Sequence, residues 1–237
     1  MTAASGRRTS SAVPRVCALI PAFNEADSIG DVVAGVASRV AAVLVVDDGS
    51  YDGTAEAAER AGAGCLRLGV NRGKGFAIRA GLERLLQGDY THVLLLDGDG
   101  QHRPADAQAL IDCAAATGAD LVIGARSFER ARMPASRHFS NTVGSRIASW
   151  LVGRDVPDSQ SGFRLARVEA LRGLRLRATR YEIEMEMLIK LCLRGATVAQ
   201  APVAMVYAGG RARSKMNPVR DTVRICLWSL AYRFLRR

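Results

Sequence analysis

The chain lacks any long apolar run, and this absence limits the kinds of protein it can be. Nowhere in its 237 residues is there a stretch of about 18 apolar residues, the length that a membrane-spanning helix needs. The N-terminal sequence MTAASGRRTSSAVPR also lacks the apolar core of a secretory signal. We therefore expect no transmembrane helix, a disordered lead-in over residues 1–14 and a single domain over residues 15–237. An organellar transit segment is the alternative for the lead-in.

Cysteine and histidine are also sparse, and their spacing excludes two kinds of site. The five cysteines include no CxxC pair, which favours free thiols in a reducing compartment. The three histidines lie far apart in the sequence, which argues against a His-based zinc site. No helix–turn–helix, zinc-finger or aromatic RNA-binding signature is present, so we expect no nucleic-acid partner.

Positive charge, by contrast, is abundant. The chain has 33 Lys and Arg against 23 Asp and Glu, a formal net charge of +10. This excess points to an anionic partner such as a nucleotide, a phospholipid or another phosphate. The alternative is a basic surface that serves only solubility.

The first half of the chain alternates short apolar runs with helix-like segments. The runs are rich in branched residues, as strands covered on both faces should be, and they span residues 16–20, 43–46, 93–96 and 121–123. The segments with helical spacing span residues 29–40, 54–61, 75–86 and 105–117. This alternation predicts an α/β fold, with a mostly parallel sheet flanked by helices on both faces.

The second half of the chain follows a different pattern. Residues 137–151 look helical, and residues 181–194 predict an amphipathic helix with one apolar face, ended by Gly195. The stretch DSQSGFRLA, residues 158–166, looks too polar and too Gly-containing for a core element, whereas residues 198–206 look extended. A last helix at about 218–237 has two apolar stripes on opposite sides, which favours packing on the domain plus contact with a membrane or another subunit.

Polar and glycine-rich sequences follow each of the four apolar runs. They read PAFNE, DDGS, DGDGQ and GAR. In open α/β sheets, ligands bind outside the carboxyl ends of the strands. We therefore expect these four sequences to form one ligand-binding edge.

The stretch LLLDGDGQH suits a divalent cation. Asp97 and Asp99 can both approach one Mg²⁺ or Mn²⁺ ion, and Gln101 offers another oxygen. Gly98 and Gly100 let phosphate oxygens come close to the backbone. A polar turn that contains aspartates is the alternative.

Two further stretches favour contacts with a nucleotide. Asp48 can accept hydrogen bonds from a base or a ribose, although it could instead cap the helix that begins at Thr54. Lys74 lies between two glycines at a helix start, where anions are favoured. Farther on, GGRARSKMNP places Arg213 and Lys215 in a basic loop that could close over a diphosphate or simply be an exposed surface loop.

Eight stretches in order resemble the family 2 glycosyltransferases of the GT-A fold, most closely the dolichyl- and polyprenyl-phosphate sugar synthases. The stretches are IPAFNEADSI, VLVVDDGSYDGT, NRGKGFAIRAG, LLLDGDGQH, VIGAR, DSQSGFRLA, YEIEMEMLIK and RSKM. One mild departure is Phe23, where the family commonly has tyrosine.

The resemblance implies roles for particular residues. The implied donor-binding set is Pro21, Ala22, Asn24, Glu25, Asp48, Lys74, Asp97, Gly98 and Asp99. The implied metal ligands are Asp97, Asp99 and Gln101, where Asp99 also counts as catalytic. Three basic residues match positions near the donor or acceptor phosphate: Arg126, Arg213 and Lys215.

The expected function is metal-dependent transfer of a hexose, with inversion, from a GDP-mannose or UDP-glucose type donor to a polyprenyl or dolichyl phosphate. We expect a cytoplasmic protein held peripherally on an anionic membrane, with a homodimer as another use of the last helix. A soluble acceptor is the first alternative, and a non-catalytic nucleotide-binding protein is a remote one.

A sugar hydroxyl acceptor would need a general base, unlike a phosphate. The candidates are Glu182, Glu184 and Asp158, of which helical spacing makes Glu182 the most inward-facing. A structural role for Glu182 is equally compatible with burial. We expect His102 to be a bystander.

Overall fold

A single mixed sheet forms the centre of the protein. The computed structural model describes residues 14–126, 144–146, 149–151, 153, 158–204 and 224. Within them seven strands lie in the order β3-β2-β1-β4-β6-β5-β7. Their bounds are β1 Val16–Ala22, β2 Ala42–Asp47, β3 Gly64–Arg67, β4 His92–Leu95, β5 Leu121–Arg126, β6 Arg164–Arg167 and β7 Val198–Val203. All neighbouring strands are parallel except β6, which runs antiparallel to both β4 and β5.

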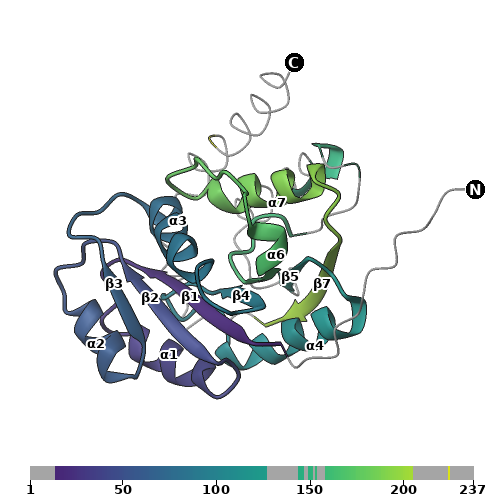
Figure 1. Ribbon diagram of the computed structural model, residues 1–237. Helices are drawn as coiled ribbons and strands as arrows, with labels where there is room; N and C mark the ends of the chain where they lie inside the picture. Colours follow the sequence, from purple (N-terminus) through teal and green to yellow (C-terminus); the bar gives the residue numbers. More distant parts are fainter. Residues whose placement is uncertain are drawn as a thin grey trace, which may run out of the picture.

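Helices cover both faces of this sheet, as predicted (Figure 1). One face packs against α1 Ile29–Ala37, α2 Thr54–Arg60 and α4 Ala107–Thr117, which follows the short 3-10 helix η1 Pro104–Asp106. The other face packs against α3 Lys74–Leu85, α6 Val168–Leu171 and α7 Ile183–Leu193. The mostly parallel α/β architecture expected from the alternating sequence is therefore confirmed.

Strand β1 shows why the continuous apolar runs form central strands. Successive side chains point to opposite faces, so Leu19 enters the core under α3 and α7, while Ala18 and Ile20 enter the core under α1 and α4. All three side chains are fully buried. A strand buried on both faces has no polar positions, which produces the unbroken apolar pattern.

The prediction that DSQSGFRLA contains no core element is wrong, because β6 lies inside the sheet between β4 and β5. Arg164 begins β6 and is completely buried. Its guanidinium donates hydrogen bonds to the main-chain oxygens of Ser161 at 2.7 Å, Ser159 at 2.6 Å and Glu184 at 2.6 Å. These acceptors satisfy the donors that make a buried arginine costly, so a polar sequence can occupy a core strand.

Three other elements differ from the prediction. Strand β3, a short edge strand whose residues are half-buried or exposed, and the short helix α6 were not predicted. Helix α7 was predicted to bury one face, but every residue from Ile183 to Ile189 is buried. Glu184 and Glu186 are among them, because Lys74 and Lys190 pair with their carboxylates. Leu193, the last residue of α7, is 47% exposed.

The predicted lead-in, the basic loop with Arg213 and Lys215, and nearly all of the last predicted helix lie outside the described residues. In the part of the chain that is described, no helix combines the length and the hydropathy needed to cross a bilayer.

Helix α3 lies so close to the sheet that it requires glycine at position 81. A Cβ at Gly81 would lie 2.3 Å from Cδ1 of Leu19 and 3.0 Å from Cγ2 of Val46. We expect Gly81→Ala to lower the free energy of unfolding by about 2 kcal/mol, because overpacking displaces the helix or distorts the core. Urea denaturation would measure the change.

The matched control is Gly30→Ala in α1, where a Cβ would meet no atom within 4 Å. Alanine there should be neutral or stabilising by up to about 1 kcal/mol through helix propensity. Equal stabilities for the two variants would contradict close packing of α3 on β1.

Candidate active site

The loops that follow β1, β2 and β4 meet at one edge of the sheet. The backbone N–H of Asp48 donates to the main-chain oxygen of Ala22 at 2.8 Å, which joins the first two loops. The hydroxyl of Ser28 donates to the main-chain oxygen of Gly98 at 2.8 Å, which joins the first and third. The predicted convergence of PAFNE, DDGS and DGDGQ is therefore confirmed.

Asn24 fastens the first loop to the second. Its backbone N–H donates to Oγ of Ser50 at 2.9 Å, and its Oδ1 accepts from the N–H of Tyr51 at 3.1 Å. The residue has a φ of 52°, in the left-handed region that asparagine tolerates better than most residues. The next N–H, that of Glu25, donates to Oγ1 of Thr54 at 2.8 Å. Asn24 therefore shapes the loop with both its backbone and its side chain.

Asp48 fixes the entrance to α3. Its two carboxylate oxygens accept from the backbone N–H groups of Arg72 at 2.8 Å and Gly73 at 2.7 Å. Burial raises the pKa of Asp48, and these two donors oppose that rise. Asp48 does not cap α2, since Oδ1 of Asp52 accepts from the N–H of Thr54 at 3.0 Å. The capping alternative for Asp48 is therefore wrong.

Lys74, the first residue of α3, lies between two carboxylates. Its Nζ is 2.6 Å from Oδ1 of Asp97 and 2.6 Å from Oε1 of Glu184, whose side chain is 6% exposed. Burial by itself lowers the pKa of Lys74, but both carboxylates raise it, and the net pKa lies above its ordinary value. The ammonium is therefore charged, and it is committed to these two acids rather than free to bind an anion.

Gly162 and Gly75 leave the room that this charged cluster needs. A Cβ at Gly162 would lie 2.8 Å from Oδ2 of Asp97 and 3.0 Å from Nζ of Lys74. A Cβ at Gly75 would lie 2.6 Å from the main-chain oxygen of Ala178, in the segment before α7. The antiparallel strand β6 matters here, because it begins just after Gly162 and so brings this loop to the ligand edge.

Asp97 and Asp99 fit a divalent cation. Burial, and then the nearby charge of Asp97, raises the pKa of Asp99 to about 6. A cation between the two carboxylates would relieve this repulsion, and both offer the oxygen donors that Mg²⁺ and Mn²⁺ prefer. Gln101 follows closely, since its N–H donates to Oδ1 of Asp99 at 3.0 Å, and its side-chain nitrogen is buried without a hydrogen bond to the described residues.

The described ranges contain no group of three or more His, Cys, Asp or Glu side chains that could hold a metal ion by themselves. An ion bound by Asp97 and Asp99 would therefore need further ligands. Magnesium sites built from one or two carboxylates commonly take substrate phosphates and water as the remaining ligands.

Comparison with known proteins decides the family. Residues 17–175 match the family described as Glycosyl transferase family 2. The chain is a family 2 glycosyltransferase. This glycosyltransferase is 36% identical over 211 residues to Glycosyltransferase AglJ of Haloferax volcanii, across 87% of this chain and 68% of the relative. It is 30% identical over 235 residues to an undecaprenyl-phosphate mannosyltransferase of Micrococcus luteus, across 93% of this chain and 96% of the relative.

Solved structures agree on the fold of the glycosyltransferase. Mannosyl-3-phosphoglycerate synthase from Rubrobacter xylanophilus matches with a TM-score of 0.71 at 22% identity, over 94% of this chain and 74% of that one. Glucosyl-3-phosphoglycerate synthase from Mycobacterium tuberculosis, solved with Mn²⁺ and UDP, matches with a TM-score of 0.68 at 22% identity, over 93% of this chain and 80% of that one. The predicted GT-A fold is confirmed.

The three general-base candidates of the glycosyltransferase are all buried. Glu182 is 3% exposed, as its predicted inward position requires, and its Oε1 lies 2.5 Å from Nε of Arg224 in the last predicted helix. Glu184 instead pairs with Lys74. Asp158 is 1% exposed. The helical spacing correctly indicated that Glu182 is buried, but it carried no information on these partners.

Other predicted residues are placed only in part. Pro21 and Ala22 lie at the buried end of β1. Arg126 ends β5 at the ligand edge, whereas its side chain lies outside the description. His102 is buried, with its ring 5.2 Å from that of Phe163, and the expectation that it is a bystander stays a prediction. Gly162 was not among the predicted site residues, although it lies in the family stretch DSQSGFRLA.

Proposed function

We propose that this glycosyltransferase moves a hexose from a nucleotide diphosphate sugar to a polyprenyl or dolichyl phosphate, with inversion at the anomeric carbon. The observation that carries the proposal is the placement of Asp97 and Asp99 together at the strand-end edge, beside two loops suited to a nucleotide. The lipid acceptor is supported by the names of relatives, among them the undecaprenyl-phosphate mannosyltransferase and a polyprenol monophosphomannose synthase of Mycolicibacterium smegmatis that is 31% identical over 203 residues.

The first two loops are proposed to bind the donor. Asn24 and Asp48 hold these loops and the start of α3 in one arrangement, through the hydrogen bonds described above. A prearranged site loses less entropy on binding than one that must first become ordered. The base and ribose are proposed to contact the loop backbone and Glu25, while Asp48 positions residues 72–73.

Asp97, Asp99 and Gln101 are proposed to hold Mg²⁺ or Mn²⁺, with Gly98 leaving space for the diphosphate. A bound ion would supply positive charge to the departing diphosphate. Lys74 has a different part in this proposal, because its pairs with Asp97 and Glu184 fix the carboxylate of Asp97 in place. Arg126, Arg213 and Lys215 are proposed to contact donor or acceptor phosphate, as charge-assisted hydrogen bonds favour.

A phosphate acceptor makes a general base unnecessary. The second pKa of a phosphate monoester is about 6, so its oxygen is already largely ionised at neutral pH. That oxygen attacks the anomeric carbon from the face opposite the leaving diphosphate and inverts the configuration. Glu182 then keeps a structural task, since its ion pair with Arg224 joins α7 to the last predicted helix. The enzyme is proposed to act as a peripheral protein at the cytoplasmic membrane face, where such lipids are reached.

The deciding experiment incubates the full chain with labelled GDP-mannose or UDP-glucose, undecaprenyl phosphate and Mn²⁺. We expect label in the organic phase, and none after EDTA treatment. Label that appears only on a soluble acceptor, such as 3-phosphoglycerate, would favour the alternative in which the acceptor is soluble. No transfer to any acceptor from a panel of donors would contradict the proposal.

Gly162→Ala tests the cluster at the centre of the site. The added methyl group would push Asp97 or Lys74 out of place, and misplacing a catalytic group by about 1 Å costs on the order of a hundredfold in rate. We expect that loss in kcat/KM and a weaker titration of Mn²⁺ by calorimetry. Gly30→Ala is the control, because a methyl group there meets no atom. Unchanged Mn²⁺ binding in Gly162→Ala would contradict the claim that this glycine keeps Asp97 in position to bind the metal ion.

A further inference from the structure

The segment between α6 and α7 presents arginines on one side and apolar residues on the other. Its sequence over residues 172–180 is RGLRLRATR. Leu174 and Leu176 pack against the core beneath α3 and α7. The four arginines of the segment are all exposed: Arg172, Arg175, Arg177 and Arg180. These four residues are called the arginine face below.

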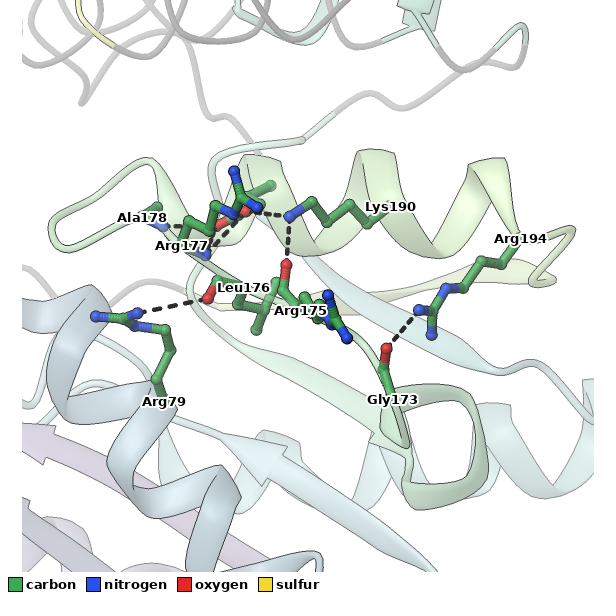
Figure 2. Close-up of polar contacts among 9 residues, drawn as sticks. Arg79, Gly173, Arg175, Leu176, Arg177, Ala178, Lys190 and Arg194 are labelled. Atoms are coloured by element: carbon green, nitrogen blue, oxygen red, sulfur yellow. Dashed lines mark hydrogen bonds and ion pairs between the residues drawn. The ribbon is translucent and has the colours of Figure 1, made fainter. Parts of the chain in front are cut away.

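The backbone of this segment is fixed although it forms no helix or strand. Figure 2 shows cationic side chains directed at its main-chain oxygens. Arg79 of α3 donates to Leu176, Lys190 of α7 to Arg175, and Arg194, just after α7, to Gly173. These carbonyl groups are thereby satisfied from within the protein. The arginine side chains of the segment are left to project outward.

Glu186 of α7 fixes the same segment from the protein interior. Its side chain is fully buried, and its Oε2 accepts from the N–H groups of Arg177 at 2.8 Å and Ala178 at 2.7 Å. A buried carboxylate is tolerated only when it is paired and hydrogen-bonded. These hydrogen bonds hold the backbone that carries the four arginines in one arrangement, which lowers the backbone entropy lost when a partner binds.

The arginine face carries charge that is mostly uncompensated. Arg172 lies 3.8 Å from Glu169, and no ion pair is recorded for Arg175, Arg177 or Arg180 within the residues that the structure describes. Nearby, Arg72, just before α3, and Arg79 of α3 both lie over the ring of Phe76. On the opposite helical layer, Glu56 and Glu59 of α2 instead form ion pairs with Arg67. Within the described residues, the arginine face is therefore a local concentration of positive charge largely without acidic partners.

We propose that the arginine face docks the protein on an anionic phospholipid surface. This inference rests on the proposed function, in which the acceptor is a lipid phosphate. The arginine face is continuous with the active site, because the N–H of Gly75, next to Lys74, donates to the main-chain oxygen of Thr179 at 2.9 Å. Leu193, an exposed apolar side chain beside Arg194, adds a group suited to a lipid interface. Docking through this face places the site beside lipid headgroups.

The test measures binding of the full chain to vesicles without donor or acceptor. Phosphatidylcholine vesicles with and without phosphatidylglycerol are sedimented with wild type and with Arg175→Gln/Arg177→Gln. Each basic residue near an anionic surface contributes about 1 kcal/mol, so the variant should bind phosphatidylglycerol vesicles about thirtyfold more weakly. Neutral vesicles should bind neither protein.

The matched control removes the same charge from the opposite layer, as Arg39→Gln/Arg60→Gln. It should bind anionic vesicles nearly as well as wild type, and thermal unfolding should verify that both variants are folded. Equal losses in the two variants would mean that only net charge matters and would overturn the inference. Undiminished binding by Arg175→Gln/Arg177→Gln would overturn it too, as would displacement from vesicles by duplex DNA.

Vesicle binding and sugar transfer can fail separately. If the protein binds anionic vesicles through Arg175 and Arg177 but labels no lipid, the docking surface stands and the proposed function falls. If Arg175→Gln/Arg177→Gln binds vesicles like wild type while undecaprenyl phosphate is glycosylated, the proposed function stands and the proposed docking surface is wrong. Both variants should retain wild-type turnover of acceptor dispersed in detergent.

Discussion

Asp99→Asn is expected to lower kcat/KM for sugar transfer by about a thousandfold, the scale of losing a group that stabilises developing charge. Asparagine keeps the shape of the side chain but removes the charge that attracts a divalent ion. The charge matters because burial, and then the charge of Asp97, raise the pKa of Asp99, so a divalent ion beside the pair would stabilise its ionised form. The variant should lose sugar-transfer activity and affinity for Mn²⁺ together, as measured by transfer assays and by calorimetric titration.

Asp112→Asn serves as the control for Asp99→Asn, because Asp112 is exposed on α4, on the far layer of the sheet. It removes one negative charge and should leave turnover and Mn²⁺ binding unchanged. If Asp99→Asn bound Mn²⁺ and turned over like wild type, the assignment of the ion to this pair would be wrong. Loss of turnover with intact Mn²⁺ binding would mean that Asp99 contacts the donor and is not a metal ligand.

Arg164→Met is expected to lower the free energy of unfolding by about 4 kcal/mol, because unsatisfied buried acceptors cost about 1–3 kcal/mol each. The variant would remove the donors from three main-chain oxygens, those of Ser159, Ser161 and Glu184. Two of these belong to the loop before β6 and one to α7. Urea denaturation would report the loss as a lower midpoint with an unchanged slope.

Arg167→Met, on the same strand, is the control for Arg164→Met. Arg167 is partly exposed, donates to the main-chain oxygen of Gly118 and lies 3.5 Å from Asp120. Partly exposed ion pairs contribute up to about 1 kcal/mol, so this variant should lose no more than that. A loss of similar size in both variants would show that the main-chain oxygens around position 164 recover other donors.

The sequence predicted those parts of the fold that depend on local pattern. The runs that became β1, β2, β4 and β5 are continuous and apolar, because strands buried on both faces admit no polar side chain. Strand β6 breaks that rule at Arg164, whose burial depends on main-chain oxygens supplied by other segments. No local pattern of residues indicates such acceptors, so the sequence does not predict a core strand at this position.

The candidate site divides in the same way. Asp97 and Asp99 were predictable because a carboxylate pair directly follows a buried strand. The pairing of Lys74 with Asp97 and Glu184 was not, because it depends on how α3 and α7 approach each other across the sheet. The helix-start position of Lys74 correctly placed it at the ligand edge, but its ammonium is engaged by carboxylates rather than exposed to an anion.

The Lys74–Glu184 ion pair also bears on the order in which the protein folds. Its two residues are 110 positions apart (184 minus 74). Contacts between residues so distant in sequence form late, since a long loop must close before they stabilise anything. An early intermediate made of β1, β2, α3 and β4 would bring Lys74 to Asp97 but would leave it without the carboxylate of Glu184. Neither half of the chain alone contains the whole candidate site, so this site is complete only once α7 has packed on the sheet.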